Sequence, residues 1–369
     1  MGESEKVKVL YVGHYNESSG WGQAARDYIL ALNKVGIDVV PRAINLGLSD
    51  FPVPNLIRKL EQKDLAGCNI IIQHVLPHYM VYDSCFKKNI GFFVVETKNI
   101  EHTKWIDNLN LMDELWVPCW EMTELKLKPP IHVVPHTCDI TEFQRTYPAL
   151  NIEKTKDKFV FYFIGQYNRR KHITAILRAF HNEFYPTEPV ELVLKVNRYG
   201  MNPAELANEI NGLTHGVKEN LNLYQDIKRY KQELVITVNI PRDELLSLHA
   251  TCDCFVCASF GEAFCLPAWD AMAMGNLVIA GNTGGPKDYI KPSYLVEGTY
   301  EPVFGERDCF DSFGSSRELE FHISILDLQR KMRMAYENND PVVRNRNQIN
   351  AQQYDYEMVG NQMKELIYA

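Results

Sequence analysis

Short apolar runs alternate with longer polar segments along most of this 369-residue chain. The first run, residues 7–13, has the pattern of a buried strand, and after a Gly/Ser loop an apolar-periodic stretch from Gln23 to about Lys34 predicts a helix. Further apolar runs lie at 39–40, 69–73, 89–96, 114–117 and 131–134. Strands that alternate with helices in this way predict a parallel sheet covered by helices.

A second α/β unit follows a charged stretch without periodicity, residues 151–158, where we expect the domain boundary. Residues 300–318, rich in Gly, Ser and Phe, indicate a long loop. The sequence thus predicts two Rossmann-like domains, residues 1–150 and 151–344. The expected strands of the second domain are 159–164, 190–196, 234–238, 254–257 and 277–280, with a helix at 173–180.

The composition is that of a globular protein, with 46% apolar and 23% charged residues. Residues 1–8 show no export signal, and no run of eighteen apolar residues occurs, so we expect a cytoplasmic protein without a transmembrane segment. Peripheral membrane contact stays open. The formal net charge of −8 argues against non-specific nucleic-acid binding, which needs clustered basic surface.

The nine cysteines are expected to be reduced thiols, because no secretory signal accompanies them. Cys252, Cys254 and Cys257 form the densest group. They lie in an apolar strand-like run without a second Cys or His pair at ligand spacing, so we expect no metal.

A pair of carboxylates marks the first candidate site. Glu262 precedes a short helix that Pro267 opens and Gly275 closes, and Asp270 is expected in the first turn of this helix. The unpaired backbone N–H groups at such a helix start, here near Cys265, suit a phosphate. Acidic residues are also common near helix N-termini for electrostatic reasons alone, and the pair by itself does not decide between these interpretations.

A basic loop, Gly165 to His172, follows the strand at 159–164. Its consecutive cations Arg169, Arg170 and Lys171 come at the carboxyl end of a predicted parallel strand, where open α/β sheets bind ligands, and they would neutralise a diphosphate. The alternative is an ordinary solvated loop.

Two glycine-containing segments could admit a ligand close to the backbone, residues 18–23 and 283–288. The first does not complete the dinucleotide-binding pattern, since Ala25 stands where a third glycine belongs. Both segments also suit ordinary turns.

The order of these pieces resembles the retaining nucleotide-sugar glycosyltransferases of family 4, which have the GT-B fold. The family pattern of two carboxylates separated by seven residues reads Glu262 and Asp270 here, followed by 271–275 and by Gly284–Gly285. Arg170 and Lys171 match the family's phosphate clamp. The family's glycine-rich loop resembles residues 20–22, and the segment before its interdomain linker resembles residues 133–139. Its terminal helix, which crosses back to the first domain, resembles residues 348–367.

The resemblance implies two Rossmann-like domains whose parallel sheets face an interdomain cleft, with a crossing helix at about 345–369 on the N-terminal, acceptor-side domain. It implies Glu262, Arg170 and Lys171 as catalytic residues. The implied donor-binding residues are Gly165, Arg169, Ile240, Gly261, Ala263, Phe264, Cys265, Leu266 and Asp270. The implied glycine-rich loop and acceptor-side residues are Gly20, Trp21, Gly22, Gln23, His74 and Glu96.

Three positions depart from the family pattern. Asp270 replaces a glutamate, Gln166 stands where many members carry an arginine, and Glu96 stands where many have a histidine near the acceptor. The shorter side chain of Asp270 puts its reach toward the ribose in question. Gln166 does the same for one phosphate contact, and Glu96 for the acceptor chemistry.

The implied reaction moves a sugar from a UDP- or GDP-sugar to a hydroxyl of a glycan, glycolipid or glycoconjugate, with retention and without metal or cofactor. Two alternatives stay open. One is another GT-B enzyme, such as a sugar-nucleotide epimerase or a DNA-modifying transferase. The other is a nucleotide-sugar-binding protein without catalysis.

Overall fold

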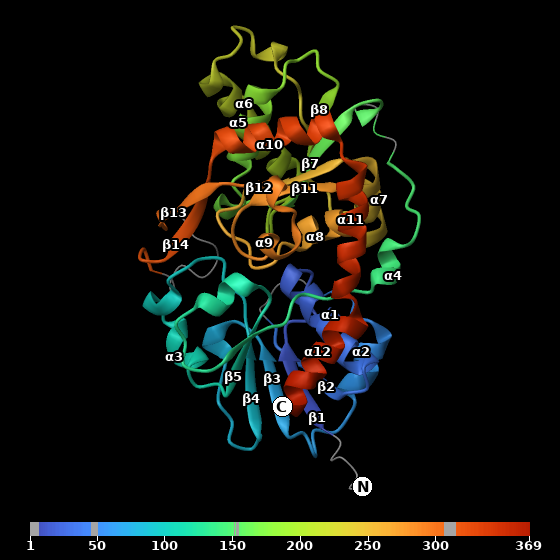
Figure 1. Ribbon diagram of the computed structural model, residues 1–369, viewed down its shortest axis with the longest axis vertical. Coiled ribbons are helices and arrows are strands. Elements are labelled where there is room, and N and C mark those ends of the chain that lie inside the picture. Colours follow the sequence, from blue (N-terminus) through green and yellow to red (C-terminus); the bar gives the residue numbers. More distant parts are fainter. Residues whose placement is uncertain (1–6, 46–50, 151, 153–154, 306–314) are drawn as a thin grey trace. The chain divides into compact units, whose positions relative to one another are not determined.

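The computed structural model describes residues 7–45, 51–150, 152, 155–305 and 315–369. Contacts divide the chain into two compact units (Figure 1). Unit 1 comprises the described residues of Met1–Glu142, Ser312–Glu318 and Gln352–Ala369, and unit 2 those of Phe143–Asp311 and Leu319–Ala351. The N-terminal residues that bear on an export signal, 1–6, lie outside the described residues, as do parts of the expected boundary at 151–158.

Unit 1 contains a six-stranded sheet, and its neighbouring strands pair in parallel, as the sequence predicts. Strands such as β3 are buried along their whole length, which explains why they read as unbroken apolar runs. In sheet order the strands are β2 (Asp38–Ala43), β1 (Lys8–Gly13), β3 (Ile70–His74), β4 (Lys88–Phe92), β5 (Glu114–Val117) and β6 (Ile131–Val133). The helices are α1 (Gly20–Lys34), α2 (Asn55–Glu61), α3 (Trp105–Leu109) and α12 (Tyr356–Tyr368), with α4 (Ile140–Phe143) at the end of the unit's first segment.

Unit 2 contains a second six-stranded parallel sheet, which confirms the other predicted sheet. In sheet order its strands are β12 (Leu295–Val296), β11 (Leu277–Gly281), β10 (Cys254–Cys257), β7 (Phe159–Gln166), β8 (Val190–Asn197) and β9 (Leu234–Ile236). Its helices are α5 (Ile173–Glu183), α6 (Pro203–Leu221), α7 (Arg242–Thr251), α8 (Leu266–Ala273), α9 (Pro286–Tyr289), α10 (Ile325–Asn338) and α11 (Pro341–Ala351). Among the described helices, none is long and apolar enough to cross a membrane.

Strand order locates the place where each sheet can bind a ligand. In unit 1 the order reverses at β1, which has β2 on one side and β3 on the other, and in unit 2 it reverses at β7, between β8 and β10. Loops at the carboxyl ends of such neighbouring strands diverge and leave a crevice. The loops after β7 and β10 therefore meet at the switch point of unit 2.

The predicted terminal helix at 348–367 is wrong as one continuous element. α11 ends at Ala351, and α12 begins at Tyr356 after a turn of 3-10 helix. Asp355 caps α12 by accepting a hydrogen bond from the backbone N–H of Glu357, which fixes a new helix start. α12 packs beside α1 in unit 1 (Figure 1), where a side chain at Gly360 would clash with the carbonyl oxygen of Ala31.

Two other local expectations are wrong. The segment expected as a loop at 300–318 begins in a strand, β13 (Gly298–Pro302), which pairs antiparallel with β14 (Leu319–Ile323); residues 306–314 lie outside the described part. The glycine-rich segment expected before the first helix is instead its first turn. Ser19 caps α1 by accepting a hydrogen bond from the N–H of Gly22 at 3.2 Å, so the helix starts at Gly20.

Buried histidines sit in the core of unit 1. His74 accepts or donates a hydrogen bond with the Tyr11 hydroxyl at 2.7 Å, and His136 does so with Tyr28 at 2.7 Å. Burial lowers the pKa of both imidazoles, that of His136 to about 3. Both rings are therefore neutral in the folded protein at neutral pH.

Acid should destabilise the protein through these rings. Unfolded His136 takes up a proton near pH 6.5 but the folded side chain only near pH 3, so its stabilising contribution is present above pH 6.5 and is lost as the pH falls. The loss should reach about 2 kcal/mol at pH 5. Urea unfolding followed by circular dichroism at pH 7 and pH 5 measures it. His136→Asn should show a smaller drop than the wild type, whereas His215→Asn, at an exposed position of α6, should match the wild type. An unchanged drop in His136→Asn contradicts the assignment.

Candidate functional site

Glu262 lies at the centre of the site in unit 2, in the loop between β10 and α8. Its side chain is buried, and Lys171 donates a hydrogen bond to its Oε1 at 2.5 Å. Arg170 approaches the same oxygen at 3.3 Å and donates to the carbonyl oxygen of Gly261 at 2.8 Å. The structure thus brings together all three residues predicted as catalytic.

The charged groups of this cluster keep one another ionised. Burial alone would raise the pKa of Glu262, but the charges of Lys171 and Arg170 and hydrogen bonds from Lys171 and Ser259 lower it to about 2. Burial and Arg170 lower the pKa of Lys171, yet the Glu262 charge and the neighbouring thiols outweigh them and raise it. Glu262 is therefore a carboxylate at neutral pH and cannot serve as a proton donor.

The basic loop is a single turn of 3-10 helix, Arg169–Lys171, which Asn168 caps. Arg169 turns away from Glu262 and makes two hydrogen bonds, of 2.7 and 2.5 Å, to Glu320 on β14. Its guanidinium also lies 4.6 Å from the centre of the Phe260 ring. Of the three predicted phosphate-binding cations, two therefore face Glu262 and the third joins the loop to the β13–β14 hairpin.

Two glycines shape the Glu262 loop from behind. The N–H of Gly285 donates to the carbonyl oxygen of Glu262 at 3.1 Å. A Cβ at Gly284, whose φ is +60°, would come within 1.9 Å of that oxygen, and a Cβ at Gly285 within 2.5 Å of Ala263. The sequence suggested that this pair leaves room for a ligand; in the structure the protein's own loop fills that room.

The helix that follows the loop begins as expected. α8 starts at Leu266, with Pro267 in its first turn, and Cys265 caps it in a left-handed conformation with φ of 67°. The carbonyl oxygen of Phe264 accepts a hydrogen bond from the Tyr289 hydroxyl at 2.6 Å. The N-terminus of α8 is thus held beside Glu262.

Asp270 is the fifth residue of α8 and so lies just past the first turn, because the helix begins one residue earlier than expected, at Leu266. Arg242, the first residue of α7, donates to Oδ2 and Oδ1 of Asp270 at 2.5 and 3.1 Å. The half-buried Ile240 lies in the loop just before α7. This bidentate pair connects the predicted ribose-binding carboxylate to the loop predicted to contact the base.

Another predicted donor residue, Gly165, and the departing position Gln166 lie at the end of β7. Gly165 is the second-last residue of β7, and a Cβ there would clash with the Phe163 ring at 2.7 Å. Gln166, at the end of β7, is exposed. Sequence reasoning missed Arg242, Glu320 and Tyr289, since no local pattern marks a partner so distant in the chain.

The predicted acceptor-side residues belong to unit 1, at the carboxyl ends of its strands. Trp21 lies in the first turn of α1, and its ring centre is 5.2 Å from that of His74 at the end of β3. Gln23 donates to Asp27 at 2.8 Å, and a Cβ at Gly22 would lie 2.1 Å from the carbonyl oxygen of Glu17. The half-buried Glu96 follows β4 in a separate loop. Sequence reasoning missed two more rings beside Trp21. The ring centre of His14 lies 6.2 Å from that of Trp21, and the ring centre of Tyr79 lies 6.4 Å from that of His14.

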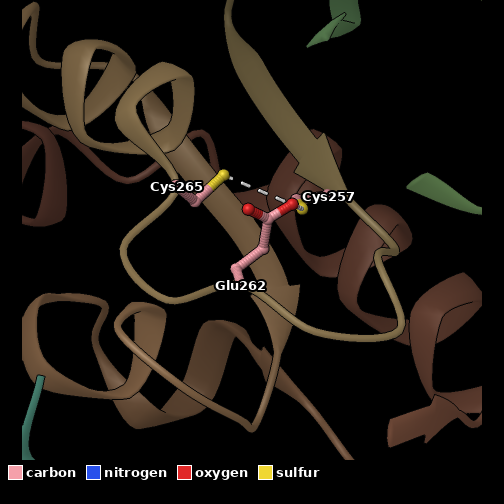
Figure 2. A group of neighbouring side chains, drawn as sticks. All are labelled: Cys257, Glu262 and Cys265. Atoms are coloured by element: carbon pink, nitrogen blue, oxygen red, sulfur yellow. Dashed lines mark hydrogen bonds between the residues drawn. The ribbon is translucent and has the colours of Figure 1, made fainter. Parts of the chain in front are cut away.

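Metal-binding potential is confined to one group within the described ranges: Cys257, Glu262 and Cys265, whose ligand atoms lie within 4.8 Å of one another (Figure 2). Lys171 and Arg170 already neutralise the carboxylate of this group. Their positive charges oppose a cation there.

Comparison with known proteins agrees with this geometry. Residues 150–301 match the family model described as "Glycosyl transferases group 1". The matched segment contains Glu262, the basic loop and both glycines. A search of the curated proteins finds no match to the sequence.

Solved structures share the fold of the whole chain. Anabaena Alr3699/HepE in complex with UDP is 12% identical, with a TM-score of 0.66 over 98% of this chain and 100% of that one. Sucrose-phosphate synthase from Thermosynechococcus elongatus is 15% identical, with a TM-score of 0.62 over 98% of both chains. The lipopolysaccharide outer core galactosyltransferase WaaB is 13% identical, with a TM-score of 0.61 over 98% and 99%. The chain has the two-domain α/β fold of these proteins, the predicted GT-B fold.

The Arg242–Asp270 pair should be energetically coupled. Because Asp270 is buried, removing Arg242 alone leaves an uncompensated carboxylate, whereas removing both charges does not. A double-mutant cycle of Asp270→Asn and Arg242→Gln, measured by urea unfolding, should give a coupling energy of about 1 kcal/mol or more. Additive single effects would contradict a structural role for the pair. Arg198→Gln with Glu209→Gln, an exposed ion pair of the same unit, is the control and should show little coupling.

Proposed function

We propose that this protein is a retaining, metal-independent glycosyltransferase of family 4 that moves a sugar from a nucleoside-diphosphate sugar to an acceptor hydroxyl. The observation that carries the proposal is the cluster of Glu262, Lys171 and Arg170 beside the N-terminus of α8, at the switch point of the unit 2 sheet. It combines a permanently ionised carboxylate, two cations and a helix N-terminus.

The diphosphate of the donor would bind the cationic side of this cluster. Lys171 supplies a compact charge and Arg170 a planar fork, and the backbone N–H groups at the start of α8 add donors with the positive end of the helix dipole behind them. As the bond to the sugar breaks, negative charge grows on the departing phosphate. Groups already placed around that charge lower the barrier most.

Glu262 would accept hydrogen bonds from hydroxyls of the donor sugar. Its low pKa keeps it ionised, so its charge also favours the oxocarbenium character that develops at the anomeric carbon. No separate base is needed on the donor side, since the leaving phosphate can take the proton of the acceptor hydroxyl on the same face. This geometry yields retention.

Asp270 would accept from the ribose, and the backbone near Ile240 would contact the base. UDP is the first nucleotide to test, because the similar HepE was solved with UDP-glucose and with UDP. GDP is the second. The acceptor, a glycan, glycolipid or glycoconjugate, would meet unit 1 at the half-buried Trp21, since an aromatic ring can pack against a sugar face. The buried His74 would support the Trp21 ring from behind.

A cytoplasmic location belongs to the same proposal, with peripheral membrane contact left open. The eight cysteines within the described residues are free thiols, which suits a reducing compartment. Cys309 lies outside the described residues.

Replacing Glu262 should abolish most of the transfer. We expect Glu262→Gln to lower kcat/KM about a hundredfold, because the neutral amide loses the charge that stabilises the transition state. The assay is release of UDP or GDP from a panel of sugar nucleotides, with and without glycan acceptors. Glu191→Gln removes another buried, ion-paired carboxylate of unit 2, that of β8 with Lys158, and should stay near wild type. Full turnover by Glu262→Gln rules out the assignment, and binding without turnover on any acceptor favours the non-catalytic alternative.

The stereochemistry and metal dependence can be read in one experiment. Product formed from an α-linked donor should carry an α linkage in proton NMR spectra, and the rate should be unaffected by EDTA. An inverted product contradicts the retaining mechanism. Loss of activity in EDTA that Mg²⁺ or Mn²⁺ restores contradicts metal independence. An altered sugar nucleotide without transfer to an acceptor favours an epimerase.

A further inference from the structure

Two cysteine thiols flank the Glu262 carboxylate. The Cys265 thiol donates a weak hydrogen bond to Sγ of Cys257 at 3.9 Å, and Sγ of Cys257 lies 3.8 Å from Oε1 of Glu262 (Figure 2). Both cysteines are buried in unit 2. Neither thiol takes part in the reaction proposed above, in which Cys265 contributes only through the backbone at the start of α8.

The two cysteines are held by different kinds of element, a sheet strand for Cys257 and a helix cap for Cys265. Cys257 is the last residue of β10 and pairs in register with Ala280 of β11, so its backbone is fixed by the sheet. Cys265 caps α8 at the end of the loop that carries Glu262. A disulfide needs about 2.05 Å between the sulfurs, and closing the gap falls on this loop rather than on the strand.

Electrostatics make the two thiols unequal. The hydrogen bond from Cys265 lowers the pKa of Cys257, whereas burial and the Glu262 charge raise it. With the Lys171 charge and a hydrogen bond from Ser259 added, the net shift is downward. The same hydrogen bond and burial raise the pKa of Cys265. Burial, helped by the charge of Asp253, raises the pKa of both Cys252, which lies just before the strand, and Cys254, its first residue. Cys257 is thus the nucleophilic thiol of the group and Cys265 the resolving one.

We propose that Cys257 and Cys265 form a reversible oxidation site, at which a peroxide converts the two thiols into a disulfide that displaces Glu262. The Cys257 thiolate sulfur attacks one oxygen of hydrogen peroxide, the O–O bond breaks, and hydroxide leaves while sulfur is oxidised to a sulfenic acid. The Cys265 sulfur then attacks the Cys257 sulfur. The S–O bond breaks, the S–S bond forms, and hydroxide takes the Cys265 proton as water. The hydroxide released in the first step takes the proton that the Cys257 thiol gave up, so two thiols and one peroxide give one disulfide and two waters.

The disulfide would act on the donor site through the loop between its two ends. Glu262 lies inside the closed ring of residues 257–265, and drawing Cys265 toward Cys257 shifts the residues between them against Lys171 and against Gly285. This consequence rests on the proposed function, since it assumes that Glu262 belongs to a donor site. Formation of the disulfide itself does not depend on the proposed function.

Peptide mapping by mass spectrometry tests the oxidation site directly. The full-length protein is treated with hydrogen peroxide, remaining thiols are alkylated, and the digest should contain a peptide pair linked through Cys257 and Cys265 that dithiothreitol separates. Cys265→Gly, a residue that tolerates the left-handed backbone there, and Cys257→Ser should each abolish the link; Cys254→Ala, a matched buried thiol, should not. A protein without this link after peroxide treatment overturns the proposal.

Calorimetric binding of UDP and GDP, with hydrogen exchange of the peptide containing Glu262, tests the consequence. Oxidation should weaken nucleotide binding at least tenfold and speed exchange in that peptide, dithiothreitol should reverse both, and Cys265→Gly should be insensitive to peroxide. A linked protein with unchanged exchange and unchanged affinity overturns the effect on the site. A reduced protein that binds neither nucleotide counts against the proposed function, while exchange and the linked peptide still decide the oxidation site.

Discussion

The ion pair between Glu262 and Lys171 is the contact on which the candidate site depends. A carboxylate in the interior costs several kcal/mol unless it is paired, so the loop after β10 can bury Glu262 only while Lys171 and Arg170 stay beside it. These residues come from loops 91 positions apart. The same ion pair therefore holds the two loops together at the switch point of the sheet and keeps the Glu262 carboxylate ionised.

Backbone sterics add a second constraint from the opposite side. The carbonyl groups of Glu262 and Ala263 pack directly on Gly284 and Gly285, with no space for a Cβ. The cations hold the side chain of Glu262 while the glycines hold its backbone, so the loop is fixed from two directions. Placement of this kind before a ligand arrives is what electrostatic catalysis requires.

Much of this could be predicted from the sequence because the relevant signals are local. Buried parallel strands appear as unbroken apolar runs, and Pro267 with Gly275 marks both ends of α8. The break before α12 could not be predicted from periodicity, because the helical pattern continues through it and the Asp355 cap decides. The partners Arg242 and Glu320 also left no signal, since each lies in a different element from the carboxylate or cation that it binds.

The pairing of Arg242 with Asp270 bears on how a shorter carboxylate can stand in the position of a glutamate. Asp270 lacks one methylene group and so reaches less far from α8. Two hydrogen bonds from Arg242 fix its orientation and join α8 to α7, whose preceding loop contains Ile240. If the ribose binds Asp270 and the base lies near Ile240, the ion pair sets the distance between the two contacts. The position of α7 relative to α8 would then compensate for the shorter side chain of Asp270. In that case Arg242 would contribute to nucleotide recognition by positioning Asp270 and the Ile240 loop, without touching the nucleotide.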